Sequence, residues 1–259
     1  MSPYLKLNLS IVYSNTNQHD RATALNQEVV ASARRLKYDD ILSFGLQHSS
    51  RNHIFYGRWD DVMRDAEEGI DAARRTGNQY ILFGLLMALY EAESALKRFD
   101  ASDAIIAELR MLANEFGSAW YHLEIDLCVT QIALGRGLVA DTLAHLVTLG
   151  ERMVGLEEDD PYLRMTWLRT AANTLIAAAD DAVGARLYGY FERKSQALEG
   201  DFVILAGGVA HQTERAMLRA RLGDRFDALI ADGAALDDEQ AFTLARERIT
   251  AALARIFES

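Results

Sequence analysis

Histidine and aspartate side chains spaced four residues apart share one face of a helix, and two such ligands can begin a metal site. His122 and Asp126 have this spacing, but the sequence offers no evident third ligand, so pairing on a helix surface is the plainer interpretation. Cys128 is the only cysteine, which excludes an internal disulfide. A catalytic thiolate needs a basic partner that the sequence does not identify, so we expect Cys128 to pack as a small core residue.

The segment 135–140 (GRGLVA) fits the pattern G-x-G-x-x-A of dinucleotide-binding turns. That chemistry requires a strand before the glycines and a helix whose N-terminus meets the pyrophosphate. Residues 121–134 have the pattern of a helix, so we interpret the glycines as a turn between two helices. The sequence also lacks G-x-x-x-x-G-K-[ST], H-E-x-x-H, C-x-x-C and G-x-S-x-G, which predicts a non-enzymatic chain without a cofactor.

Two clusters of charge are interpreted as solvated surface. Residues 157–160 (EEDD) lack the alternating ligands and central glycine of a calcium loop. The arginines of 215–225 are interleaved with Glu214, Asp224 and Asp227. With 38 acidic against 27 basic residues, the net charge is −11. Such a charge repels a phosphate backbone, so we expect no nucleic-acid partner.

The 259 residues are 50% apolar and 25% charged, an ordinary globular composition, and Pro3 and Pro161 are the only prolines. So few prolines favour helices joined by short turns. The first residues (MSPYLKLNLSIVY) lack the charged and apolar regions of a signal peptide. The longest apolar run, 80–90, is shorter than the roughly 20 residues that a bilayer requires. We therefore expect a soluble, cytoplasmic chain without a membrane partner.

Helical periodicity is clearest in residues 59–75. Apolar residues recur there at steps of three and four, and charged residues occupy the other face, as in a helix with one buried stripe. Asp60 is predicted to cap the start of this helix. Arg74 and Arg75 fall in its last turn, before Gly77, where cations oppose the negative end of the helix dipole.

An internal repeat organises the chain. A turn followed by Asp recurs at 17–20 (NQHD), 57–60 (GRWD) and 97–100 (KRFD), at intervals of 40 residues, and looser versions follow at 137–141, 180–181 and 223–227. Each interval is interpreted as one helical hairpin, with Asp60 and Asp100 as caps of the second helix and Trp59 and Phe99 buried between hairpins. A single hairpin cannot bury its apolar stripe, so neighbouring hairpins must stack.

We predict hairpins at 3–37, 38–76, 78–117, 118–155, 160–199 and 201–233, followed by a helix at 237–257, in a single domain of residues 1–259. Asp160 and Pro161 should begin the fifth hairpin as N-cap and first helical residue. Asp237 and Gln240 should form a capping box before the last helix. The adjacent Gly207 and Gly208 should break the helical pattern, and the apolar run 202–205 should pack on the core.

The turns GRWDD and KRFDA resemble those of tetratricopeptide (TPR) repeats. The segments 185–189 (ARLYG), 222–227 (LGDRFD) and 232–241 (DGAALDDEQA) resemble the tail of large bacterial signalling ATPases, many of which carry LuxR-type or cyclase-like domains. This chain has Ile230 or Ala231 where that family often has Trp, and the run 202–205 where it has a proline-containing loop. The resemblance implies an all-α, right-handed superhelical solenoid of about six TPR-like hairpins and a final helix, acting as a sensor or scaffold segment in transcriptional regulation or signalling.

In TPR repeats the first helix of each hairpin lines the concave side, and its ligand-facing positions are counted back from the turn. The resemblance therefore implies a groove lined by Phe44, Gln47, Arg51 and Ile54, by Gly84, Met87, Glu91 and Ser94, and by Asp126. The alternative is that these residues only pack, or that the chain's own helices fill the groove. The expected partner is a protein or peptide segment, including neighbouring ATPase or output domains. A second hypothesis is a direct sensor that binds a peptide or small metabolite in the same groove.

Overall fold

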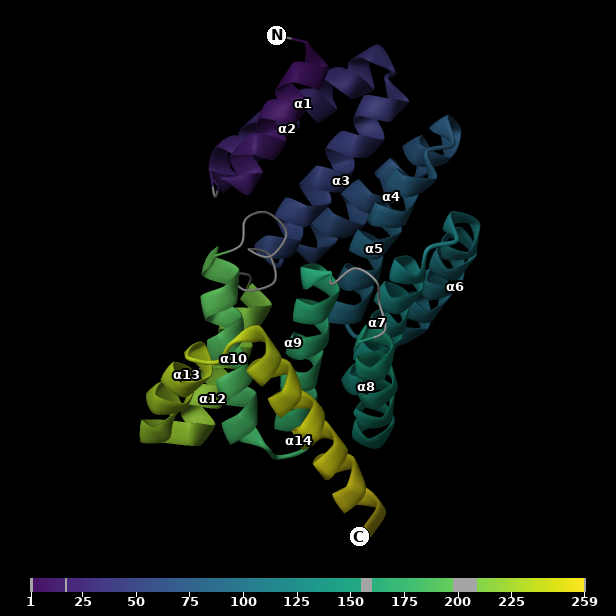
Figure 1. Cartoon of the computed structure of the whole chain (residues 1–259). Coiled ribbons are helices and arrows are strands. Elements are labelled where there is room, and N and C mark those ends of the chain that lie inside the picture. Colours follow the sequence, from purple (N-terminus) through teal and green to yellow (C-terminus); the bar gives the residue numbers. More distant parts are fainter. Residues whose placement is uncertain (1, 17, 155–159, 198–208, 259) are drawn as a thin grey trace. The chain divides into compact units, whose positions relative to one another are not determined.

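The computed structural model describes residues 2–16, 18–154, 160–197 and 209–258, and all regular structure in these residues is helical. The expected all-α class is therefore confirmed. Short turns join the helices into hairpins (Figure 1). The helices are α1 (Pro3–Asn15), α2 (His19–Leu36), α3 (Asp39–Phe55), α4 (Trp59–Thr76), α5 (Gln79–Ala95), α6 (Phe99–Phe116), α7 (Ala119–Gly135), α8 (Val139–Val154), α9 (Pro161–Ala177), α10 (Asp181–Ala197), α12 (Val209–Leu222), the 3-10 turn η1 (Gly223–Arg225), α13 (Phe226–Ala234) and α14 (Asp238–Glu258).

The 40-residue period of the sequence is present in the helix boundaries. Second helices of successive hairpins begin at His19, Trp59, Phe99 and Val139, and first helices begin at Asp39, Gln79 and Ala119. Left-handed backbone recurs with the same period, within hairpins at Gly57, Lys97 and Gly137 and between hairpins at Lys37, Gly77 and Gly117. The glycine pattern of 135–140 is thus the turn between α7 and α8, as the sequence predicts.

Asp60 and Asp100 are not the N-caps that the sequence predicts. The N-cap of α4 is Arg58, whose side chain makes no capping hydrogen bond, and α6 begins one period later in the same way. Because the left-handed residue Gly57 already reverses the chain, the helix starts at Trp59, before the aspartate. Each carboxylate therefore lies in the first helical turn, where it interacts favourably with the helix dipole.

Trp59 and Phe99 are half-buried, whereas the sequence predicts that both are buried. As the first residue of its helix, Trp59 lies at the rim of a small apolar cluster that Val62 forms with Ala88 and Ala92. The indole does contact the neighbouring hairpin, but its position at a helix end leaves part of it open to solvent.

Two other predicted caps are confirmed. The Asp160 carboxylate accepts hydrogen bonds from the backbone N–H groups of Tyr162 and Leu163 at 2.8 and 3.0 Å, and Pro161 is the first residue of α9. Asp237 and Gln240 exchange side-chain to backbone hydrogen bonds at 2.8 and 3.0 Å before α14. The predictions for 157–159, for the run 202–205 and for the glycines at 207 and 208 fall outside the described residues.

Contacts divide the chain into two compact units, and the first contains α1–α6. Within it, each helix packs on the next along the chain, and α3 also packs on α1 and α5. Figure 1 shows the resulting row of three hairpins. Leu46, Leu85 and Leu109, one from each of α3, α5 and α6, are fully buried between them.

Two ion pairs between second helices follow the same period. The Arg34 guanidinium of α2 donates to the Glu68 carboxylate of α4 at 2.7 and 2.5 Å, and 40 residues later Arg74 of α4 donates to Glu108 of α6 at 2.7 and 3.0 Å. Exposed pairs of this kind contribute only about 0–1 kcal/mol each. They nevertheless show that successive hairpins of this unit are joined in the same register.

The second unit contains α7–α10, α12 from residue 210, α13 and α14. Its last helix packs back on α8, α9 and α10. Phe242 of α14 contacts Trp167 of α9 with ring centroids 4.8 Å apart, and the fully buried Trp167 indole donates to the Leu146 carbonyl of α8 at 3.1 Å. The C-terminal helix therefore covers apolar side chains of α8 and α9.

Two glycines allow α10 and α13 to approach closely. A methyl group at Gly189 would lie 2.0 Å from the carbonyl oxygen of Ile230, and one at Gly233 would lie 1.8 Å from that of Arg186. Backbones can come this close only where no side chain intervenes. The glycines of the segments ARLYG and DGAAL thus have a definite structural role.

The apolar run 80–90 lies in α5, where Leu82, Leu85 and Leu86 are buried. None of the helices in the described part of the chain is both long enough and apolar enough to cross a membrane.

Candidate functional site

The predicted groove residues of the first unit lie on two helices that pack against each other. Phe44, Gln47, Arg51 and Ile54 are on α3, and Gly84, Met87, Glu91 and Ser94 are on α5. All of them are half-buried. Each combines contact with its neighbours and a surface that solvent reaches, as a binding position requires.

Gln47 and Gly84 form a direct contact between α3 and α5. A methyl group at Gly84 would lie 1.8 Å from the Gln47 amide nitrogen. The missing side chain at 84 therefore makes room for the amide of Gln47.

The imidazole of His48 lies beside this row on α3. Its ring centroid is 4.9 Å from that of Phe44. Burial, with a smaller effect of the Arg51 charge, lowers the pKa of His48 to about 4. The histidine is therefore neutral at physiological pH, and Arg51 carries the positive charge of this part of α3.

Arg51 and Glu91 occupy the same position in successive first helices. One period further, α7 has Gln131, and the corresponding position of α9 is Asn173. In the second unit Gln131 donates to Thr170 at 3.2 Å, and Asn173 accepts from Tyr188 at 2.7 Å. Neither residue was among the predicted groove residues, although the 40-residue register extends to Gln131.

Asp126, the predicted groove residue of α7, lies in the second unit and is half-buried. Its carboxylate accepts from Arg152 of α8 at 2.5 Å. His122 is half-buried on the same helix. Within the described residues, no three His, Cys, Asp or Glu side chains lie close enough together to hold a metal ion.

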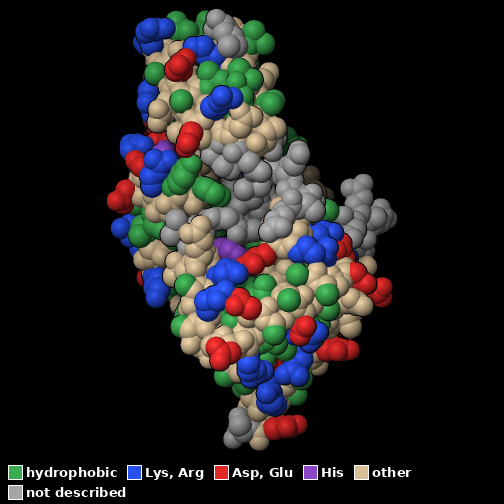
Figure 2. All heavy atoms as spheres, turned by 90° about the vertical axis from the view of Figure 1, so that its left-hand side faces the viewer, with side chains coloured by type: hydrophobic (Ala, Val, Ile, Leu, Met, Phe, Trp, Pro, Cys, Tyr) green, Lys and Arg blue, Asp and Glu red, His purple; other side chains and the backbone are tan. Residues whose placement is uncertain are grey.

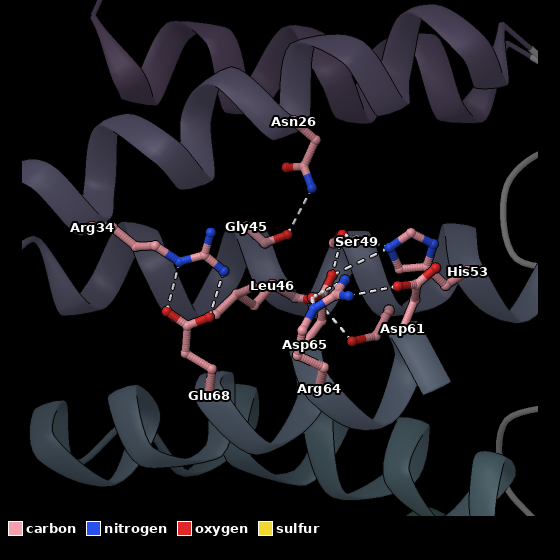
Figure 3. Close-up of polar contacts among 11 residues, drawn as sticks. Asn26, Arg34, Gly45, Leu46, Ser49, His53, Asp61, Arg64, Asp65 and Glu68 are labelled. Atoms are coloured by element: carbon pink, nitrogen blue, oxygen red, sulfur yellow. Dashed lines mark hydrogen bonds and ion pairs between the residues drawn. The ribbon is translucent and has the colours of Figure 1, made fainter. Parts of the chain in front are cut away.

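A buried polar network joins α3 to α4 in the first unit (Figure 3). The Ser49 hydroxyl donates to Asp65 Oδ2 at 2.6 Å, and His53 Nε2 lies 3.3 Å from the same oxygen. Arg64 donates to Asp65 Oδ1 at 3.0 and 3.1 Å. Burial alone would raise the pKa of Asp65, but hydrogen bonds from His53, Ser49 and Arg64 outweigh it and lower that pKa.

The network has the residue types of a nucleophilic triad but a different geometry. In a triad the histidine stands between serine and aspartate and uses a different ring nitrogen for each. Here His53 Nε2 faces both Ser49 Oγ, at 3.4 Å, and Asp65 Oδ2, while His53 Nδ1 is buried without a hydrogen-bond partner in the described part of the chain. This arrangement joins α4 to α3 through the Asp65 carboxylate.

Further polar contacts connect this network to α2. The Asn26 amide donates to the Gly45 carbonyl of α3 at 2.8 Å, and Arg34 binds Glu68 (Figure 3). Contacts from α2 and α4 thus hold α3, which carries four of the nine predicted groove residues.

A cleft of about 510 Å³ opens between α2 and the turn after α3. Its lining residues are Asp20, Thr23, Ala24, Gln27, Tyr56 and Arg58. Arg58 stacks on the Tyr56 ring, with 4.9 Å from guanidinium carbon to ring centroid, and the Tyr56 hydroxyl is 3.5 Å from Asp20. One period later Met63 and Arg64 replace Thr23 and Ala24. Residues 23 and 24, which line the cleft, are thus smaller than their counterparts one period later.

A second polar cluster connects α9, α10 and α12. The Tyr188 hydroxyl contacts both Asn173 and Glu214, and burial together with the Glu214 charge raises the pKa of Tyr188. Glu192 of α10 accepts from His211 at 3.2 Å and from Arg215 at 2.8 Å, and these contacts attach α12 to α10.

Comparison of the chain with protein-family models, with curated proteins and with solved structures found no match.

Proposed function

We propose that this chain is a non-enzymatic helical-repeat module that binds a protein or peptide segment along the first helices of its hairpins. In this proposal about six TPR-like hairpins form a right-handed superhelical solenoid within one domain, and the groove residues of α3 and α5 contact the partner. The observation that carries the proposal is the repeated register: half-buried residues occupy the same positions of two adjacent first helices, including the oppositely charged Arg51 and Glu91.

The resemblance of the turns and of segments 185–189 and 232–241 to bacterial signalling ATPases supports a regulatory role in the cytoplasm. The bound segment would then belong to a neighbouring ATPase or output domain. Because a ligand shifts an equilibrium only by its differential affinity for two states, such binding regulates only if it favours one docking arrangement.

Opposite charges at successive groove positions determine the direction of a bound segment more than its affinity. We therefore expect peptides selected on the whole chain from a random displayed library to carry acidic and basic residues at a fixed separation. Exchanging the charges with Arg51→Glu and Glu91→Arg together should weaken the selected peptides about five- to tenfold in fluorescence anisotropy. Peptides with exchanged charges should regain binding.

The double exchange keeps the net charge and retains any attraction between positions 51 and 91. A matched control exchanges the exposed Arg35 and Glu247 and should leave peptide binding unchanged. Equal binding to the wild-type chain and to the 51/91 variant would exclude these positions from the binding surface.

A further inference from the structure

One face of α1 exposes apolar side chains to solvent. Tyr4 and Leu5 are each 59% exposed and Val12 is 54% exposed. Asn8, on the same face, is also exposed. In Figure 2, which views the molecule from the side where α1 and α2 lie in Figure 1, hydrophobic side chains reach the surface among charged ones in the upper part. We refer to Leu5, Asn8, Val12 and the neighbouring Glu28 of α2 as the α1 end face.

In the two hairpins that follow, the second helix of the preceding hairpin packs on this part of the first helix. Forty residues after Leu5, Asn8 and Val12 are Gly45, His48 and Asn52 of α3, and forty further are Leu85, Ala88 and Ala92 of α5. A methyl group at Gly45 would lie 3.0 Å from Val30 of α2. On α5, Ala88 and Ala92 form a cluster with Val62 of α4. Gly45 of α3 and Ala88 and Ala92 of α5 therefore contact the second helix of the preceding hairpin.

Leucine occupies this interface in both α5 and α1. Leu85 is fully buried because α4 has a glycine opposite it: a methyl group at Gly69 would lie 2.7 Å from Leu85 Cδ2. Leu5 is the residue at the corresponding position of α1. Leu5 can therefore pack against a helix that, like α4, has a glycine opposite the leucine.

Glu28 of α2 occupies a position that forms an ion pair in the two hairpins that follow. Glu68 and Glu108 lie one and two periods after Glu28, and each accepts from an arginine of the preceding second helix. Glu28 is 60% exposed and pairs with Lys6 of α1 at 2.5 Å. Glu28 therefore occupies the position at which, in the next two hairpins, a glutamate accepts hydrogen bonds from an arginine.

We propose that the α1 end face binds an amphipathic helix of a partner polypeptide, placed on α1 as α4 is placed on α5. That helix has a glycine or alanine opposite Leu5, small aliphatic residues opposite Asn8 and Val12, and an arginine that reaches Glu28. This surface is separate from the groove of α3 and α5, so the inference does not depend on the proposed function.

A second copy of the chain fits this face less well. A symmetric pair would place the large side chains Tyr4, Leu5 and Val12 of one copy against the same residues of the other, because an isologous contact joins identical patches. It would offer neither a glycine opposite Leu5 nor an arginine for Glu28. The observed interface between α4 and α5 supplies the glycine, and that between α4 and α6 supplies the arginine.

The probe is a labelled, end-blocked peptide of residues 58–78, which has the sequence of α4 with Gly69 and Arg74. We expect saturable binding to the whole chain in fluorescence anisotropy, with half-saturation below about 100 μM. Leu5→Asp should weaken it at least about tenfold because a charge would then face the apolar stripe. Val12→Asp provides a second, independent variant at another exposed position, and circular dichroism confirms that both variants are folded.

Met111→Asp is the matched control, because Met111 is 61% exposed on α6 of the same unit. It should bind the peptide like the wild-type chain, as should the variant exchanged at 51 and 91. Glu28→Arg should weaken binding about two- to fivefold, and a peptide with Arg74→Glu should restore it.

Absence of saturable binding, or unchanged binding after both Leu5→Asp and Val12→Asp, would overturn the proposal. Sedimentation velocity tests whether a second copy of the chain occupies the α1 end face. A wild-type dimer that Leu5→Asp converts to monomer would assign the face to a second copy and also overturn the proposal. A wild-type monomer that binds the peptide supports it.

Discussion

His48 shows how one buried side chain makes stability depend on pH. Burial lowers its pKa from the ordinary 6.5 to about 4, with a smaller effect from Arg51. Between these two values the unfolded chain binds a proton at this residue and the folded chain does not. Because stability rises with pH wherever the unfolded state binds more protons, acidification through this window destabilises the fold.

We expect the free energy of unfolding to fall by about 2 kcal/mol between about pH 7 and pH 5 because of His48. His48→Gln should remove this part of the pH dependence. Urea titrations at the two pH values measure the difference, and His145→Gln, at an exposed histidine, is the control. The lowered pKa values of Asp65 and Glu192 place their titration below this window. The same pH dependence with and without His48 would contradict this assignment.

The sequence predicts which residues share a position in successive hairpins, because the repeat fixes that position. It does not predict which residues meet where two helices pack. The register locates Arg51 and Glu91 and extends to Gln131. The network of Ser49, His53 and Asp65 depends on how α4 lies on α3, which spacing along one helix does not give. The cleft beside Tyr56 likewise depends on how α2 lies beside the turn after α3, which the spacing of residues does not give.

At the scale of helices, boundaries were predictable where a side chain caps the helix. Asp160 and the pair Asp237 and Gln240 bond the free N–H groups of their helices as the sequence predicts. The prediction for Asp60 was wrong because aspartate is favoured both as an N-cap and in the first helical turn. The left-handed Gly57 makes the helix start at Trp59, so Asp60 lies in the first turn. A backbone conformation of this kind is only partly encoded by residue type.

The crossing of α10 and α13 gives a prediction for two helices. Gly189→Ala places a methyl group 2.0 Å from the backbone oxygen of Ile230, so one helix must move. We expect a loss of about 2–3 kcal/mol in the free energy of unfolding, in the range of other overpacked sites. Chemical denaturation of the whole chain measures it.

Gly84→Ala is the control for that substitution. The three atoms nearest to its methyl group all belong to the flexible side chain of Gln47, and alanine stabilises a helix interior by up to about 1 kcal/mol relative to glycine. It should be neutral or slightly stabilising. Equal effects at 84 and 189 would show that the close backbone approach does not limit the stability of the second unit.

At the scale of the whole chain, the period predicted the order of helices but not every partner. In the first unit the stack follows the sequence, because each hairpin exposes a stripe that the next one covers. The return of α14 onto α8 and α9 could not be predicted. An amphipathic pattern shows that a helix has an apolar face but not which surface covers it. The division of contacts into two units likewise has no counterpart in composition.

The charge of the molecule supports a last prediction, about nucleic acid. A sequence-independent affinity for DNA requires basic side chains that neutralise several phosphates together. The chain has a net charge of −11, and on the face seen in Figure 2 the basic side chains are interspersed with acidic ones. We therefore expect no saturable binding of a labelled duplex below about 10 μM at physiological salt, measured by fluorescence anisotropy. Binding in that range that weakens as salt is added would show that local basic surface outweighs the net charge. Because counterion release grows with the number of phosphates contacted, the salt dependence would also give the size of that surface.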